Sequence, residues 1–228
     1  MSTPILILGD SGSGKSASLR NLDPAKTLLI QALHKPLPFR NKGWKPYDPA
    51  TKTGNIFVTD KSVDILMYMQ GTKKKVIVID DFQYVMANEF MRRSDERGYD
   101  KFTEIGRNAW NILCMAGALP LDVRVYLLTH TETNDAGRVK VKTIGKMLDE
   151  KITVEGMFTV VLRCVVRDKE HLFATQNNGS DTTKTPMGMF EEELIDNDLA
   201  AVDNAICAYY DIPQTAHLPK VAHTTKEQ

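Results

Sequence analysis

The sequence predicts an α/β fold with a mostly parallel central sheet and a C-terminal antiparallel hairpin. Short β-rich runs alternate with helical stretches along the first 130 or so residues, an order typical of helices packed on a parallel sheet. Two later apolar runs are separated only by the charged segment Arg167–Glu170, which indicates a hairpin. With 228 residues, of which 42% are hydrophobic, the chain can bury one substantial core.

Each predicted element follows from a local pattern. Strands are expected at Pro4–Leu8, Thr27–Gln31, Asn55–Thr59, Lys75–Asp80 and Val123–His130, and the hairpin strands at Phe158–Val166 and His171–Gln176. Helices are expected at Lys15–Asn21, Lys61–Gln70 and Lys101–Ala118, the last with Asp100 as a candidate N-cap. Leu33–Thr53 is predicted to be a long loop. We expect residues 1–211 to form one domain and 212–228 a flexible tail.

Composition excludes several classes of protein. Lys and Arg number 29 and Asp and Glu number 29, so the formal charge is zero, which excludes a uniformly basic nucleic-acid coat protein. The first apolar run, Ile5–Leu8, is too short for a signal sequence or a membrane span. Three widely spaced cysteines without a CxxC pair argue against a disulfide framework or a zinc ribbon. We therefore expect a cytoplasmic globular protein that does not use a membrane.

A phosphate-binding motif follows the first predicted strand. It matches the P-loop pattern GxxxxGK[ST] and consists of Gly9, Asp10, Ser11, Gly12, Ser13, Gly14, Lys15 and Ser16. The glycines allow successive backbone N–H groups to surround a polyphosphate, and the following helix presents its positive end to the same anion. Lys15 is expected to reach the β- and γ-phosphates, and Ser16 to ligate Mg²⁺. The motif predicts ATP and Mg²⁺ as cofactors.

An acidic pair ends a second buried strand. Val76–Asp80 is a run of β-branched residues that ends in a carboxylate, at the edge where open α/β sheets bind ligands. Asp80 is predicted to be the carboxylate on the Mg²⁺ side. Asp81 is predicted to orient or polarise the attacking water, with a helix cap or a loop carboxylate as the alternative role. Glu89 is a weaker candidate for the base.

A third strand ends in two polar residues, Thr129 and His130. If it lies between the P-loop strand and the strand of Asp80, these residues are expected beside the γ-phosphate, where they would sense the nucleotide. The alternative is a histidine exposed at a strand end. The other four histidines show no metal-ligand spacing.

Basic residues are segregated despite the neutral total. Segment 35–52 combines five cations with Trp44 and Tyr47, a mixture that suits single-stranded nucleic acid, although a loop covering the sheet is an equally open interpretation. Period-two spacing puts Arg138, Lys140 and Lys142 on one face of a strand, which natural edge strands also use against unwanted pairing. The full set of candidate DNA-binding residues is Arg92, Arg93, Arg97, Arg138, Lys140, Lys142 and Lys146.

By contrast, Phe190–Asp203 has six acids and no Lys or Arg, so we expect a solvated helix face or a protein-partner surface there.

The P-loop, Val76–Asp81, Val123–His130, His34–Phe39 and Lys142–Lys151 together resemble the small phage-encoded RecA-like ATPases, some of which act as single-strand annealing proteins. The resemblance covers about residues 4–190. It implies a RecA-like P-loop NTPase core, ATP hydrolysis with Mg²⁺, single-stranded DNA binding and work beside a single-strand-binding protein. It also implies DNA-contacting loops at about Ala87–Lys101 and Thr131–Lys146. We also expect a homo-oligomer.

This sequence departs from the resemblance in one respect. RecA has a catalytic glutamate after its second strand, whereas this chain has no acid in Gln31–His34, which shifts the expected base to Asp81. The leading hypothesis is an ATPase that binds single-stranded DNA and promotes annealing or strand exchange in phage-type recombination. The alternatives are a P-loop kinase of nucleosides or nucleotides and a DNA motor of the packaging type.

Overall fold

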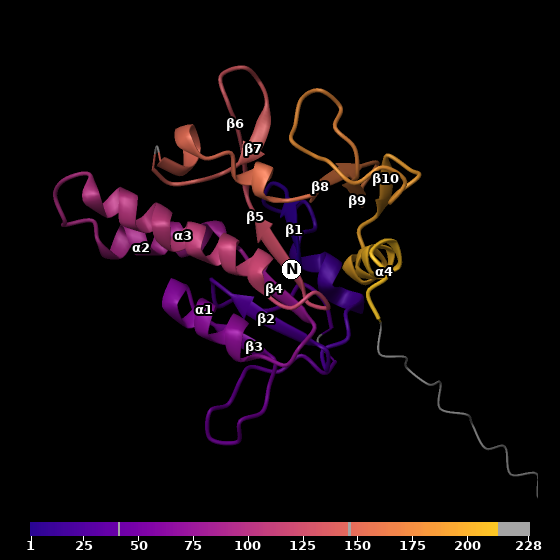
Figure 1. Ribbon diagram of the computed structural model, residues 1–228, viewed down its shortest axis with the longest axis horizontal. Helices are drawn as coiled ribbons and strands as arrows, with labels where there is room; N and C mark the ends of the chain where they lie inside the picture. Colours follow the sequence, from indigo (N-terminus) through magenta and orange to yellow (C-terminus); the bar gives the residue numbers. More distant parts are fainter. Residues whose placement is uncertain (41, 146, 214–228) are drawn as a thin grey trace, which may run out of the picture.

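The structure is a computed structural model that describes residues 1–40, 42–145 and 147–213. Its main sheet has eight strands in the order β10-β9-β8-β1-β5-β4-β2-β3 (Figure 1). The strands are β1 (Thr3–Leu8), β2 (Thr27–Gln31), β3 (Ile56–Val58), β4 (Val76–Asp80), β5 (Arg124–Thr129), β8 (Val160–Arg167), β9 (Glu170–Ala174) and β10 (Leu194–Asp196). Six of them, from β8 to β3, run parallel, and β9 and β10 add antiparallel pairs. The predicted α/β class and the hairpin are confirmed.

Two apolar layers cover the sheet, because successive side chains of a strand point to opposite faces. Leu6 and Leu8 face α1 (Ser62–Gly71), α2 (Gln83–Arg92) and α3 (Asp100–Ala118). Ile5 and Ile7 face the 3₁₀ helix η1 (Ser16–Asn21) and α4 (Leu199–Tyr209). Figure 1 shows these two groups of helices on opposite sides of the strands. The central strands are buried on both faces, so they form near-continuous apolar runs in the sequence.

A short two-stranded hairpin, formed by β6 (Thr131–Thr133) and β7 (Val139–Val141), extends from the carboxyl end of β5 (Figure 1). It is followed by a π-helical turn, Met147–Lys151, and a 3₁₀ turn, Val154–Met157. No helix among the described residues has the length and apolarity needed to cross a membrane.

Several elements differ from the sequence predictions. The segment after the P-loop is a 3₁₀ helix instead of an α-helix, and α2, β10 and α4 were not predicted. The turn of the β8–β9 hairpin is Asp168–Lys169, both with positive φ, so the strands extend closer to it than expected. Ile212 lies in the predicted tail, yet it is buried and donates its N–H to the carbonyl of Cys207 at 2.9 Å. Of that predicted tail, residues 214–228 lie outside the described residues.

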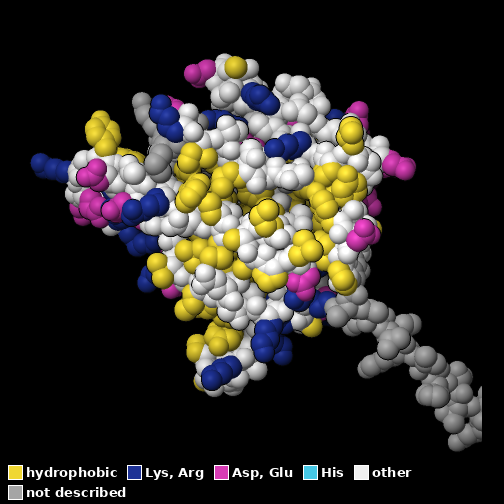
Figure 2. All heavy atoms as spheres, in the orientation of Figure 1, with side chains coloured by type: hydrophobic (Ala, Val, Ile, Leu, Met, Phe, Trp, Pro, Cys, Tyr) yellow, Lys and Arg dark blue, Asp and Glu magenta, His cyan; other side chains and the backbone are white. Residues whose placement is uncertain are grey.

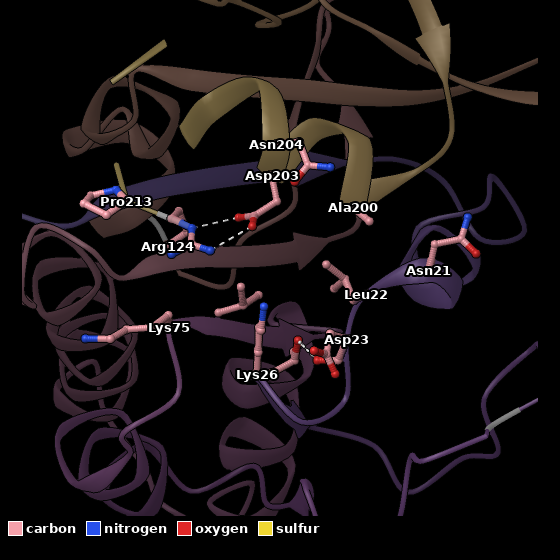
Figure 3. Close-up of a pocket in the computed structure, with 12 residues that line it drawn as sticks. Asn21, Leu22, Asp23, Lys26, Lys75, Arg124, Ala200, Asp203, Asn204 and Pro213 are labelled. Carbon is pink, nitrogen blue, oxygen red and sulfur yellow. Dashed lines mark hydrogen bonds and ion pairs between the residues drawn. The ribbon is translucent and has the colours of Figure 1, made fainter. Parts of the chain in front are cut away.

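The acidic segment before residue 204 is not a solvated face throughout. Asp203, on α4, is buried and accepts hydrogen bonds from Arg124 Nε at 2.9 Å, Arg124 Nη2 at 2.8 Å and Tyr126 Oη at 2.6 Å. Figure 3 shows this pair beside a cavity of about 220 Å³. Arg124 is the first residue of β5, so the cavity lies at the end of the sheet opposite the P-loop. Asp203 therefore anchors α4 to the sheet.

Candidate nucleotide-binding site

The P-loop connects β1 to η1 and adopts a conformation that depends on its glycines. Gly12 and Gly14 have φ of +79° and +103°, which L side chains rarely adopt. A Cβ on Gly9 would lie 2.4 Å from Ser13 Oγ and 2.9 Å from Cys164 Cβ, so only glycine fits there. The sequence motif thus corresponds to a tight backbone turn at the carboxyl end of the central strand.

Lys15 is folded back onto the loop that carries it. Its Nζ donates to the carbonyls of Gly9 at 2.8 Å and Asp10 at 2.9 Å, and the residue is 5% exposed. Burial lowers the pKa of Lys15 below its ordinary value, because desolvation disfavours the ammonium form. A phosphate would offer this buried cation a stronger, charged acceptor than two carbonyls.

Ser16 and Asp80, the two residues predicted to hold Mg²⁺, lie in contact at the ends of their segments. Ser16 Oγ lies 3.0 Å from Asp80 Oδ1 and 2.9 Å from Oδ2. Burial, and then the neighbouring charge of Asp81, raise the pKa of Asp80 to about 6. Hydroxyl and carboxylate oxygens are ligands that Mg²⁺ prefers, and a buried carboxylate gains from a cation beside it. This pair fits a Mg²⁺ ion placed against the phosphates.

Asp81 occupies an unusual backbone position. Its φ is +62° and its side chain is 3% exposed. The carboxylate forms an ion pair with Lys35 and lies 3.4 Å from His130 Nε2. Burial favours the neutral acid, but the hydrogen bonds from His130 and Lys35 outweigh burial, so the pKa of Asp81 lies below its ordinary value. The Asp81 side chain does not cap α2, because its carboxylate contacts Lys35 and His130 instead.

The strand β5 lies between the P-loop strand β1 and the acid strand β4, which confirms the condition set for the sensor positions. Thr129 is completely buried, and its Oγ1 has no hydrogen-bond partner among the described residues. His130 contacts the Asp81 carboxylate and lies edge-on to Tyr84, with ring centroids 5.8 Å apart. Both residues lie at the same carboxyl edge of the sheet as Asp80 and Asp81.

A cavity of about 430 Å³ lies between Lys15, Ser16, Asp81 and His130. It is lined by Ser11, Gly12, Gly14, Lys15, Ser16, Ala17, Lys35, Pro36, Pro38, Asp81, His130 and His171. Two titratable side chains of this lining, those of Lys35 and His171, were not assigned to the site from the sequence. His171, on β9, places Nδ1 3.0 Å from the carbonyl of Ser13, and Lys35 was assigned only to a basic loop. Neither residue belongs to a local sequence motif. The sheet register brings His171 to the P-loop, and the path of the loop after β2 brings Lys35 there.

The basic residues after β4 are largely engaged in ion pairs. Arg93 contacts Glu89 at 3.2 Å and Glu96 and Glu104 at 2.7 Å each, and Arg92 contacts Asp60 at 2.7 Å. Segment 87–101, which the resemblance suggested as a DNA-contacting loop, comprises the end of α2, the connection between the helices and the start of α3. Arg93 is therefore neutralised by three carboxylates, whereas Arg97 is exposed.

The predicted cationic strand at 138–142 corresponds to β7 and its flanks. Arg138 Nε donates to the carbonyl of Asp181 at 3.2 Å, and Lys140 Nζ lies 3.3 Å from Glu132. Lys142 lines a second cavity of about 360 Å³ together with Lys35, Asp81 and His130. Figure 2 shows Lys and Arg side chains at the β6–β7 end of the molecule. Lys146 lies outside the described residues.

The long loop before β3 covers the sheet. Trp44 is 3% exposed and belongs to the apolar layer with Leu29 and Ile56. Tyr47 stacks on Phe57 with ring centroids 4.3 Å apart. Trp44 is therefore part of the protein interior and Tyr47 is half-buried against Phe57, which agrees with the covering-loop interpretation.

The P-loop motif, the acid-ended strand β4 and the strand β5 between them lie together at one edge of a mostly parallel α/β sheet. No protein-family model matches it, and no curated protein matches it. Among solved structures it is similar to the genome packaging NTPase B204 from Sulfolobus turreted icosahedral virus 2, in complex with ATPγS. That likeness has a TM-score of 0.39 and 10% identity over 73% of this chain and 76% of the other, which is too distant to carry an argument about function.

Proposed function

We propose that this chain is a Mg²⁺-dependent ATPase that acts on single-stranded DNA. The observation that carries the hydrolase proposal is the contact of Ser16 with Asp80 beside the buried Asp81, at the mouth of the P-loop. A metal-side carboxylate and a second acid one residue further on supply both requirements of phosphoanhydride hydrolysis, which are charge stabilisation and activation of water.

Each residue has a defined task in this mechanism. The P-loop N–H groups and Lys15 bind and orient the phosphates, and Mg²⁺ held by Ser16 and Asp80 would neutralise charge on the β- and γ-phosphates. Asp81 orients the attacking water and accepts its proton, which leaves ADP and phosphate as products. His130 lines the cavity that the γ-phosphate would occupy, and Thr129 precedes it at the end of β5, so we assign to this pair the distinction between triphosphate and diphosphate.

The DNA part of the proposal rests on the location of the β6–β7 hairpin. Its first strand begins one residue after His130, and Lys142 at its other end lines a cavity with Asp81 and His130. Thr131 Oγ1 also donates a hydrogen bond to Asp10 of the P-loop. A change in the phosphate site would therefore move the base of a cationic hairpin, which is how hydrolysis would be coupled to annealing or strand exchange.

The test is ATP turnover with Mg²⁺, with and without single-stranded DNA, in parallel with a fluorescence assay of strand annealing. We expect Lys15→Ala to abolish turnover, since it removes the buried cation of the P-loop. Absence of turnover in the unaltered protein, or absence of DNA binding at low salt, would refute the corresponding half of the proposal. Phosphate transfer to a nucleoside would instead identify the kinase alternative, and ATP-driven movement along duplex DNA the packaging-type motor.

A further inference from the structure

A second lysine enters the nucleotide-binding cavity from the loop after β2. Lys35 lines the same cavity as Lys15 and Ser16, and its ammonium group forms an ion pair with Asp81. The Lys35 side chain is 43% exposed, whereas that of Asp81 is 3% exposed. Lys35 thus reaches inward from the rim of the cavity to a buried carboxylate.

The backbone of Lys35 is held, so its side chain is the part that can move. Gln31, buried at the end of β2, donates from Nε2 to the carbonyl of Lys35 at 3.2 Å. Pro36 follows directly and disfavours a helical conformation at Lys35. A lysine side chain on such a backbone can change its partner through its own flexible stem without moving the loop.

The ion pair engages the Asp81 carboxylate, which is the proposed general base of hydrolysis. Lys35 contacts one oxygen of Asp81, while His130 lies 3.4 Å from the other. A carboxylate acting as general base needs an oxygen within hydrogen-bond reach of the water. A γ-phosphate in this cavity would carry more negative charge than one carboxylate and several oxygens that can accept from the ammonium group.

We propose that Lys35 exchanges partners during the reaction: it binds Asp81 in the nucleotide-free protein and the γ-phosphate oxygens once a nucleoside triphosphate is bound. This inference rests on the proposed ATPase function and makes Lys35 a catalytic residue that contacts the substrate. The exchange has two consequences. Triphosphate is bound more tightly than diphosphate, and Asp81 becomes available to water only when a γ-phosphate is present.

The first experiment compares Lys35→Gln with the unaltered protein. Calorimetry with Mg²⁺ and without DNA would measure the affinities for ADP and for a β,γ-imido analogue of ATP, which is not hydrolysed. We expect the affinity for ADP to be unchanged and the affinity for the analogue to fall by about tenfold to a hundredfold, because one charge-assisted contact is lost. Lys45→Gln, an exposed lysine of the same loop, is the matched control and should change neither affinity.

A double-mutant cycle with Asp81→Asn separates exchange from a static ion pair. Without the Asp81 charge, Lys35 no longer has to leave a partner, so Lys35→Gln should reduce analogue affinity more in the Asp81→Asn background than in the unaltered one. If the ion pair is static, Lys35 never contacts the nucleotide. Lys35→Gln would then leave the affinity for the analogue unchanged in the Asp81→Asn background.

The outcomes also separate this inference from the proposed function. If the unaltered protein hydrolyses ATP and Lys35→Gln retains both its turnover and its preference for triphosphate, the partner exchange is wrong and the ATPase assignment stands. If the unaltered protein binds the analogue but does not hydrolyse ATP, the ATPase assignment fails, while the binding cycle still decides whether Lys35 contacts the γ-phosphate.

Discussion

Asp80 is a carboxylate whose ionisation opposes the folded state. Its pKa is about 6 in the folded chain, against an ordinary value of 3.8, and burial is the main cause. A carboxyl whose pKa is raised by folding contributes stability below its unfolded pKa, and this contribution is lost as the pH rises through the folded pKa. A difference of about two units corresponds to roughly 3 kcal/mol.

We therefore predict that Asp80→Asn stabilises the nucleotide-free protein relative to the unaltered chain as the pH rises from about 4 to 6 and above. The asparagine cannot ionise, so the cost of a buried charge is removed, by up to about 3 kcal/mol. Urea unfolding at a series of pH values would measure the difference. Asp135→Asn, at an exposed position, is the control, and an equal pH dependence in both variants would contradict the assignment to Asp80.

Among the elements, α4 depends most clearly on a single polar contact. Its apolar face, with Leu199, Val202 and Ile206, packs on the sheet, while Asp203 binds Arg124 across the interface. Both members of the pair are nearly buried, and the pKa of Arg124 lies above its ordinary value because its contacts with Asp203 outweigh burial. Removal of one partner would leave an uncompensated buried charge.

We predict that Asp203→Ala lowers the free energy of unfolding by about 3–5 kcal/mol, since Arg124 would remain buried without its carboxylate. Chemical denaturation at neutral pH would measure the loss. Asp196→Ala, on an exposed position of β10, should change stability by less than about 0.5 kcal/mol. Similar losses in both variants would show that the Arg124 contact does not anchor α4.

Across the whole molecule, the zero formal charge conceals an uneven distribution. Arg138, Lys140 and Lys142 lie at the carboxyl edge with the P-loop, whereas Lys75, Asp122 and the Arg124–Asp203 pair lie at the opposite edge. Figure 2 shows a second group of cations on the long loop, at the end of the view opposite the β6–β7 hairpin. Neutrality of the chain therefore does not argue against a nucleic-acid surface at one edge.

We predict that replacing Arg138, Lys140 and Lys142 together by glutamine weakens single-stranded DNA binding and flattens its salt dependence. Each lost phosphate contact should reduce the slope of log K against log salt by about 0.7. Fluorescence titration at several salt concentrations would measure this. Replacement of Arg40, Lys42 and Lys45, which removes the same charge from the covering loop, is the control; if both triple variants behave alike, the effect belongs to total charge and not to the hairpin.

Much of the fold and the phosphate site could be predicted from the sequence, because their signals are local. The P-loop is one contiguous motif. The strand β2 (Thr27–Gln31) was predicted with its observed bounds, because it is buried on both faces and therefore forms one short, mainly apolar run in the sequence. Elements with weaker patterns were not predicted. For α4, the acids of Phe190–Asp203 suggested solvent exposure, whereas Asp203 is buried by a partner 79 positions away.

The amino-acid sequence by itself determined the α/β class, the phosphate loop and the acidic pair Asp80–Asp81, since each is specified by residues close together in the chain. Only the tertiary structure decided that β5 lies between β1 and β4, that His171 contacts the P-loop and that Lys35 binds Asp81. The physical reason is that these contacts depend on strand order, register and the path of a long loop, which arise from packing the whole sheet and leave no spacing rule in the sequence.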